Sequence, residues 1–144
     1  MIGILIATHG DFAQGLLSAV ELLAGKQEQV ETIGLHHEDS IVEFEAKVNA
    51  ALDTLDTGDG VIVFVDILGG SPSNVILRSL GRKKFYAFAD VNMAMLIQAV
   101  MMREMCGIEE LYEMILEVSK KEAHRLHEIA AESMEAEDGE EDEF

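Results

Sequence analysis

The chain has 144 residues, of which 10 are Lys or Arg and 28 are Asp or Glu, so its formal net charge is −18. This length fits a single domain, and a hydrophobic content of 49% can build a core that needs no metal or disulfide to fold. A chain this acidic offers no basic patch to neutralise phosphates, which argues against a nucleic-acid or anionic-membrane partner. The single cysteine, Cys106, cannot form an intrachain disulfide, and no Cys/His cluster has zinc-site spacing, so we expect no metal.

The first apolar run, residues 2–7, has the length of a strand and contains no charged residue, which is typical of a strand buried on both faces. The run is too short for a signal peptide or a membrane span, and we expect a cytoplasmic protein. Asp11 then opens a helix, with Gln14 three residues later as a capping-box-like pair, and Gly25 ends it.

Residues 30–35 predict a second, weaker strand. The following helix begins at Asp39 or Ser40 and places apolar residues on one face as far as Leu55.

Residues 61–65, Val-Ile-Val-Phe-Val, are the strongest strand signal in the chain. Two glycines then form a turn, Ser71 is a natural N-cap, and Pro72 fits the first position of a helix that runs to about Leu80.

Residues 85–89 predict a fourth strand, and Asn92 caps a methionine-rich helix that extends to about Met105. Residues 108–134 have apolar positions at helical spacing and predict one long, continuous helix. The last segment, residues 132–144, contains eight acids and no base, which predicts a disordered acidic tail.

Strands that alternate with helices in this way predict an α/β fold. We expect residues 1–131 to form a single domain, with an open, mainly parallel sheet of about four strands and helices on both faces. Ligands of such sheets bind beyond the carboxyl ends of the strands, near the point where the strand order reverses. The residues that follow each strand are therefore the first candidates for a site.

Two of these strand ends hold groups that can work together. His9 directly follows the first strand and Asp66 directly follows the third. Taken alone, His9 would be a surface histidine and Asp66 an ordinary turn aspartate. If the two strands are neighbours, however, the carboxylate can hold one imidazole nitrogen and leave the other free as a nucleophile.

The turn after the third strand can bind an anion. Gly69 and Gly70 let backbone N–H groups point into one hollow, and Ser71 adds a hydroxyl at the start of a helix. By itself this pattern is equally typical of a well-capped helix. The turn contains no Lys or Arg, so a phosphoryl group held there would not be locked to a fixed cation.

A histidine, an orienting aspartate and an anion-binding turn at one sheet edge are what reversible phosphorylation of histidine requires. The chain has neither a Gly-x-x-x-x-Gly-Lys-Ser/Thr motif nor a Gly-x-Gly-x-x-Gly motif, so we expect no nucleotide cofactor. The phosphoryl donor is then expected to be another phosphoprotein.

Three segments resemble one known family. They are Ala7-Thr8-His9-Gly10, the run from Val65 to Asn74 that includes Asp66-Ile-Leu-Gly-Gly-Ser-Pro, and Val91-Asn-Met-Ala-Met-Leu96. In this order and spacing they are similar to the mannose-family IIA component of the bacterial sugar phosphotransferase system, and the similarity covers about residues 1–130.

This resemblance implies a phosphotransferase in which His9 takes a phosphoryl group from the phosphocarrier HPr and passes it to a IIB component. IIB in turn phosphorylates a sugar that enters through a IIC/IID membrane channel. In the family, the aspartate matching Asp66 bonds the active histidine and the serine matching Ser71 lies beside the phosphate. Because IIA never touches the sugar, mannose, fructose, sorbose, N-acetylgalactosamine and gluconate systems all stay open.

The resemblance also implies a homodimer, which in the family can exchange a C-terminal strand; the continuous helix predicted here offers no such strand. Two residues depart from the family pattern, since Asp90 replaces a glycine and Ala94 a proline found in many members. Many members are also fused to IIB through an Ala/Pro-rich linker. The acidic tail here leads us to expect IIB on a separate chain.

Other candidate residues have simpler explanations. We interpret His36 and His37 as a solvated loop pair, and His124 and His127 as part of a polar helix face. Cys106 is expected to be a small buried side chain rather than a reactive thiol.

Three rival functions stay open. A response-regulator receiver domain also has an aspartate after its third strand, but it needs acidic metal ligands where this chain has Thr8 and His9. A flavodoxin-like protein would need aromatic residues at the strand ends to sandwich its flavin. The third rival is a non-catalytic regulator with the same fold.

Overall fold

The computed structural model describes residues 1–141 and shows one sheet of four parallel strands in the order β2-β1-β3-β4. The strands are β1 (Gly3–His9), β2 (Val30–Leu35), β3 (Val61–Val65) and β4 (Tyr86–Phe88). The helices are α1 (Phe12–Ala24), α2 (Ile41–Leu55), α3 (Ser71–Ser79), α4 (Met93–Met102), α5 (Ile108–Ser119) and α6 (Leu126–Glu141). The predicted α/β class, with a parallel sheet between helices, is confirmed.

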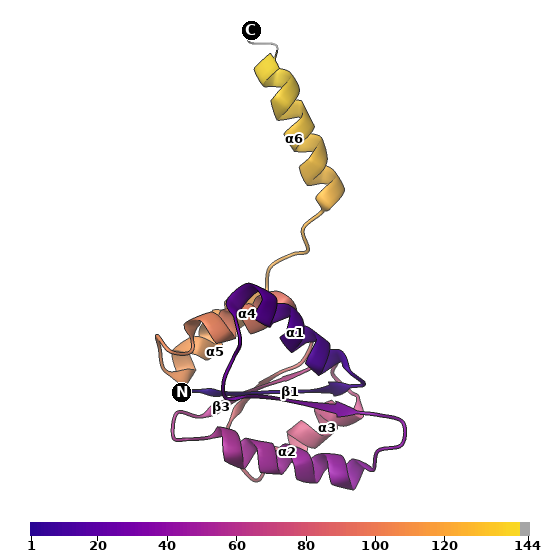
Figure 1. Ribbon diagram of the computed structural model, residues 1–144, viewed down its shortest axis with the longest axis vertical. Helices are drawn as coiled ribbons and strands as arrows, with labels where there is room; N and C mark the ends of the chain where they lie inside the picture. Colours follow the sequence, from indigo (N-terminus) through magenta and orange to yellow (C-terminus); the bar gives the residue numbers. More distant parts are fainter. Residues whose placement is uncertain (142–144) are drawn as a thin grey trace.

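The sheet separates two hydrophobic clusters. Because successive side chains of a strand point to opposite faces, Ile4 and Ile6 of β1 pack on the side of α1, α4 and α5. Leu5 and Ala7 pack on the side of α2 and α3. Figure 1 shows these two helical layers on either side of the strands. The central strands are buried on both faces, which explains their continuous apolar sequence.

The topology brings distant segments together at one edge of the sheet. β1 lies between β2 and β3: α1 connects β1 to β2, and α2 then connects β2 to β3 on the other side of β1. In the register of β1 with β3, Ala7 stands opposite Val65. His9, the last residue of β1, and Asp66, the first residue after β3, therefore lie close together.

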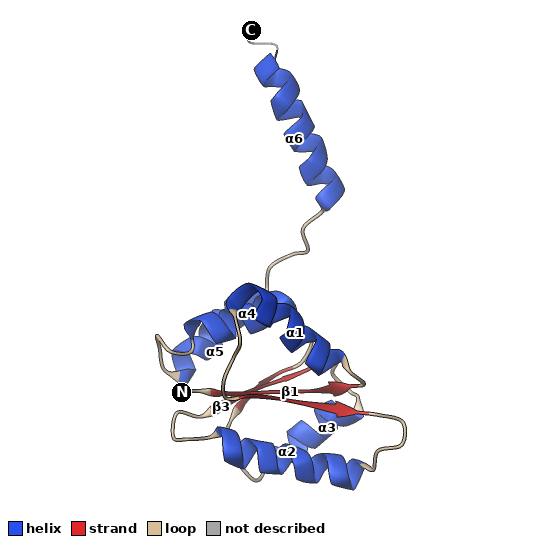
Figure 2. Cartoon of the chain, viewed as in Figure 1, coloured by secondary structure: helices blue, strands red, loops and turns tan. Residues whose placement is uncertain are grey.

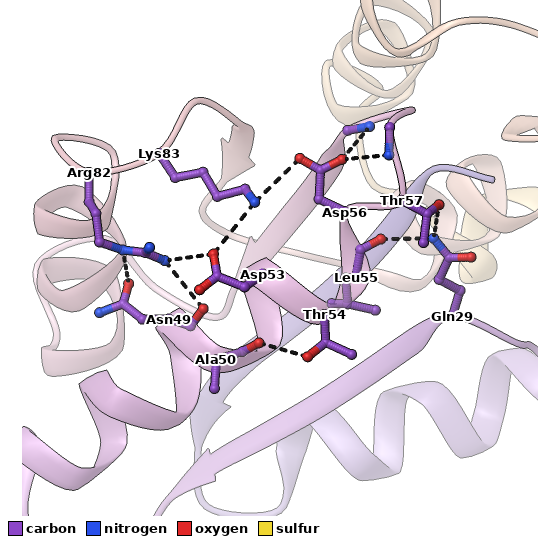
Figure 3. Close-up of polar contacts among 12 residues, drawn as sticks. Gln29, Asn49, Ala50, Asp53, Thr54, Leu55, Asp56, Thr57, Arg82 and Lys83 are labelled. Atoms are coloured by element: carbon purple, nitrogen blue, oxygen red, sulfur yellow. Dashed lines mark hydrogen bonds and ion pairs between the residues drawn. The ribbon is translucent and has the colours of Figure 1, made fainter.

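A polar cluster fixes the segment after α3 onto the end of α2 (Figure 3). The Arg82 guanidinium donates to Asp53 at 3.3 Å, and Lys83 Nζ lies 3.6 Å from Asp53 and 3.4 Å from Asp56. The Asp56 carboxylate also accepts backbone N–H bonds from Gly58 and Gly60. These contacts stabilise the end of the domain where β3 begins, away from the carboxyl ends of the strands.

The predicted long helix over residues 108–134 is wrong, because α5 ends at Ser119 and residues 120–125 are not helical. Leu111 and Ile115 of α5 are fully buried against the core. After Ser119 the chain continues as Lys-Lys-Glu-Ala-His-Arg, which has almost no apolar surface to bury. Since most helical stability in proteins comes from packing, the helix ends where its apolar face ends.

Helix α6 follows this break and stands away from the rest of the domain (Figures 1 and 2). It continues to Glu141, where the sequence predicted disorder from residue 132; residues 142–144 lie outside the described residues. Glu and Ala dominate this segment and have high helix propensity, which composition-based reasoning about charge overlooks. No helix within residues 1–141 is both long enough and apolar enough to cross a bilayer.

Candidate active site

His9 and Asp66 meet at the carboxyl ends of β1 and β3, as the sequence predicted. Asp66 Oδ2 accepts the backbone N–H of His9 at 3.0 Å and lies 2.8 Å from Nδ1 of the His9 imidazole. The other oxygen, Oδ1, accepts the backbone N–H of Ile67 at 3.0 Å. One carboxylate thus fixes both the main chain and the ring of His9.

The contact selects one tautomer of the histidine. A carboxylate can only accept a hydrogen bond, so the Nδ1 atom of His9 must carry the proton. In the neutral ring the lone pair is then on Nε2. The His9 side chain is 48% exposed, whereas that of Asp66 is 18% exposed, so the imidazole is more accessible than its carboxylate partner.

The acidity of Asp66 reflects this environment. Partial burial acts to raise the pKa of its carboxyl group, but the hydrogen bonds from the backbone N–H and imidazole of His9 outweigh that effect and lower the pKa below its usual value. Asp66 is therefore a carboxylate at neutral pH. It can offset positive charge that develops on the ring.

The N-terminus of α3 lies against the free side of the His9 ring. A Cβ atom added to Gly70 would lie 2.6 Å from Cε1 and 3.1 Å from Nε2 of His9, so only glycine allows this close approach. Gly69, just before it, has a positive φ of 93°. The first backbone N–H groups of α3 have no partner within the helix and can bind an anion at this point.

The start of α3 differs by one residue from the prediction. Gly70 is the N-cap, Ser71 is the first helical residue and Pro72 the second. The prediction expected Ser71 to cap the helix. Because Gly70 already occupies that position, Ser71 does not cap the helix, and its hydroxyl group stands in the first turn, beside the turn that contacts His9.

The turn after β1 is held by Thr8, which sequence reasoning did not select. Its side chain is fully buried, and Oγ1 accepts the backbone N–H of Ala13 at 2.9 Å. Thr8 thereby takes the capping role that was predicted for Asp11, whose side chain makes no capping bond. The sequence signal that could have identified Thr8 as the capping residue is a hydroxyl side chain near the end of an apolar strand, just before a helix.

Asp11 contacts a second histidine instead. Its Oδ1 atom lies 2.9 Å from Nε2 of His36, and Nδ1 of the same ring lies 3.4 Å from Oδ2 of Asp39. His36 was interpreted as a solvated loop residue. It is 53% exposed, but it also joins the loop after β2 to the turn after β1.

A cleft of about 700 Å³ opens beside His9, between these two loops. Its walls combine imidazole, carboxylate and aliphatic side chains, namely His9, Gly10, Leu35, His36, His37, Glu38, Asp39 and Ile41. Within residues 1–141, no three His, Cys, Asp or Glu side chains are grouped as a metal site would need.

The remaining strand end, residues 90–92, has a structural role in the described chain. Asn92 Oδ1 accepts the backbone N–H of Met95 at 2.9 Å and caps α4, as predicted. Asp90 has a positive φ of 61°, which is unusual for a residue other than glycine.

Comparison with known proteins gives a consistent result. The EIIA-man family model, described as the PTS system fructose IIA component, matches residues 3–116. The PTS system mannose-specific EIIAB component of Escherichia coli strain K12 is 40% identical over 104 residues, which are 72% of this chain but only 32% of that protein. The chain thus corresponds to about a third of the length of that relative.

Two solved structures share the fold over most of their length. The phosphotransferase system component EIIA from Streptococcus agalactiae matches with a TM-score of 0.80 and 29% identity, over 88% of this chain and 98% of that one. The PTS IIA protein associated with the fucose utilization operon from Streptococcus pneumoniae matches with a TM-score of 0.74 and 31% identity, over 89% and 95% of the two chains.

Proposed function

Because this chain belongs to the EIIA-man family of phosphotransferase-system IIA components, we propose that it is a phosphohistidine carrier. His9 accepts a phosphoryl group from phospho-HPr and passes it to a IIB component, which phosphorylates a sugar imported through a IIC/IID channel. The reaction takes place in the cytoplasm. The observation that carries this proposal is the 2.8 Å contact between His9 Nδ1 and Asp66, which leaves Nε2 free beside the N-terminus of α3.

The proposed reaction is an in-line displacement at phosphorus. The Nε2 lone pair of His9 forms the new P–N bond while the P–N bond of the donor histidine breaks and returns its electron pair to the donor ring. His9 keeps its Nδ1 proton, so its ring becomes positively charged as the bond forms. Asp66 stabilises that charge, as electrostatic preorganisation generally does in phosphoryl transfer.

The proposed phosphoryl site is the turn that joins β3 to α3. Gly69 gives this turn its shape, and the backbone N–H groups of Gly70 and Ser71 donate to the phosphoryl oxygens together with the Ser71 hydroxyl. The helix N-terminus adds a partial positive charge. Neutral donors bind the group without a fixed cation, which suits a phosphoryl group that must leave again.

Labelling from radioactive phospho-HPr tests the proposal. We expect the wild-type chain to take up label that is lost in acid and survives base, as phosphohistidine does, and then to transfer it to a IIB component. His9→Ala should take up none, whereas His124→Ala, in the exposed segment after α5, should label normally. Acid-stable label would indicate a receiver-like aspartyl phosphate, and a chain that takes up no label would indicate a non-catalytic regulator.

We also propose a homodimer in which α6 packs against a second copy. Leu126, Ile129 and Met134 of α6 are 75%, 45% and 66% exposed, and a helix of this length without packing is only marginally stable in water. On this view residues 1–131 form the phosphotransfer domain and residues 132–144 lie outside it. Sedimentation should show a dimer for the full chain and a monomer after truncation at residue 125; a full-length monomer would contradict the proposal.

A further inference from the structure

His36 is held between two carboxylates that belong to different segments. Its Nε2 atom lies 2.9 Å from Asp11 Oδ1, and its Nδ1 atom lies 3.4 Å from Asp39 Oδ2. Its backbone N–H also donates to Asp39 Oδ2 at 2.7 Å. Nε2 is at hydrogen-bonding distance from Asp11, and Nδ1 is at ion-pair distance from Asp39. Since a carboxylate only accepts hydrogen bonds, both contacts are favourable when both ring nitrogens carry a proton, that is, when the ring is an imidazolium.

The two carboxylates belong to the turn that presents His9 and to the loop that faces it. Asp11 follows His9 by two residues, and Asp39 lies just before α2. The backbone N–H of Gly10, between His9 and Asp11, also donates to the Leu35 carbonyl at 2.8 Å. The turn after β1 is therefore attached to the loop after β2 by one main-chain bond and by the His36 side chain.

The attachment depends on close packing at Gly34. A Cβ atom there would collide with the Gly10 carbonyl oxygen and lie 3.1 Å from Cε1 of the His36 ring. The His36 ring and the Gly10 carbonyl thus both lie against Gly34 of β2. Because Asp11 follows Gly10 in the chain, a change in the contact between His36 and Asp11 acts on the turn that follows His9.

We propose that His36, as an imidazolium, is a positioning residue for phosphoryl transfer: it clamps the Gly10–Asp11 turn to the loop after β2 and so fixes the backbone that presents His9. This inference rests on the function proposed above. His36 does not touch the reacting atoms. Both of its ring nitrogens are engaged by carboxylates, so we do not assign it a role as a second phosphoryl acceptor.

The charged groups around His36 favour the clamped state. The hydrogen bond with Asp11 is the main cause of a raised pKa for His36, slight desolvation opposes it, and Asp39 adds to it. Lys47 of α2 acts on Asp39, and Glu43 of α2 lines the adjacent hollow with Asp39. His37 and Glu38 follow in the same loop, and His9 lies across the cleft.

The sign of the pH dependence follows from the raised pKa. A group with a higher pKa in the folded state stabilises the clamp fully below its ordinary pKa, and this contribution is lost as the pH rises through the folded-state value. The clamp is therefore closed in mildly acidic solution and opens as the pH rises through the raised pKa of His36.

The test compares phosphoryl-transfer rates from phospho-HPr in the wild type and in His36→Gln over about pH 5.5 to 9. Gln cannot carry the charge and can donate to only one of the two carboxylates. We expect the wild type to be about tenfold faster at the acid end, because small misplacements of reacting groups slow transfer strongly, and the two rates to converge at the alkaline end. His124→Gln should match the wild type throughout.

Nuclear magnetic resonance of the unphosphorylated wild type adds a measurement that does not depend on activity. The backbone amide of Gly10 should shift with the titration of the His36 ring, and this shift should be absent in His36→Gln. Two results would overturn the clamp alone. One is equal transfer rates in the two proteins at every pH, and the other is a Gly10 amide chemical shift that does not change as His36 titrates. A wild type that accepts no phosphoryl group would overturn the proposed function, and with it the role of the clamp in catalysis.

Discussion

A single oxygen atom of Asp66, Oδ2, contacts His9 at both its backbone nitrogen and its ring nitrogen, at 3.0 Å and 2.8 Å. Rotation of the ring about its side-chain bonds would break its contact with an oxygen that the main chain of His9 also holds in place. This double contact ties the end of β1 to the end of β3. The orientation of the imidazole is therefore fixed by the positions of β1 and β3.

Asp66→Asn should slow phosphoryl transfer to His9 by roughly 10- to 100-fold, which corresponds to the loss of a hydrogen bond to a charged group. The amide oxygen of Asn can still accept a hydrogen bond, but it carries no charge to stabilise the phosphorylated ring. Rapid-quench measurement of label transfer from phospho-HPr checks this. Asp138→Asn on the exposed face of α6 is the control, and an unchanged rate in Asp66→Asn would remove the electrostatic role.

The same carboxylate should contribute to stability in a pH-dependent way. Because the pKa of Asp66 is lowered in the folded protein, its contribution is present above the unfolded-state pKa and is lost as the pH falls through the folded-state value. Urea unfolding of the wild type and Asp66→Asn should therefore show a difference in free energy of unfolding that shrinks below about pH 4. A difference that stays constant from neutral to acid pH would contradict this assignment.

Gly70→Ala should reduce transfer by at least about tenfold while the fold is retained, because the new methyl group would displace the His9 ring from the N-terminus of α3. The φ of Gly70 is −85°, so the backbone itself accepts alanine, and the effect isolates the loss of space. Circular dichroism confirms the fold and label transfer measures activity.

The matched control is Gly15→Ala in α1, where nothing lies within 4 Å of an added Cβ atom. This variant should transfer at the wild-type rate and gain about 0.5–1 kcal/mol in stability from helix propensity. If Gly70→Ala behaves like Gly15→Ala, the close approach to His9 has no functional role.

Asp90 has a left-handed backbone conformation, with φ at 61°. Asp90→Gly should therefore be more stable than Asp90→Ala by about 1 kcal/mol, since alanine bears the steric cost of this conformation and glycine does not. Both variants lack the carboxylate, so the comparison separates backbone strain from charge. Thermal unfolding measures the difference, and equal stabilities would show that the loop relaxes around alanine.

The sequence was informative where local pattern and tertiary packing agree. The apolar runs at residues 2–7 and 61–65 predicted the two central strands because a strand buried on both faces must be apolar throughout. The side chains that follow them, His9 and Asp66, could then be placed together by topology alone. Asn92 was also identified as a cap correctly, because its hydrogen bond spans only three residues.

Two predictions failed because they ignored a distant partner. Asp11 was expected to cap α1 by local rules, but His36 in another loop engages its carboxylate, and Thr8 caps the helix in its place. The helix predicted for residues 108–134 followed apolar spacing correctly as far as Ser119. Whether that spacing meets a core surface is decided by the fold, and beyond Ser119 it does not.

By itself, the sequence determined the class of fold, the order of its elements and the residues that gather at the carboxyl edge of the sheet. Hydrophobic periodicity can be recognised within each short segment, and parallel strands all end at the same edge of their sheet. Only the tertiary structure decided which ring nitrogen of His9 is held, how closely Gly70 approaches the ring, and that His36 joins two loops. Those contacts connect residues that are 25 or more positions apart, and their distances depend on how the strands and helices pack together.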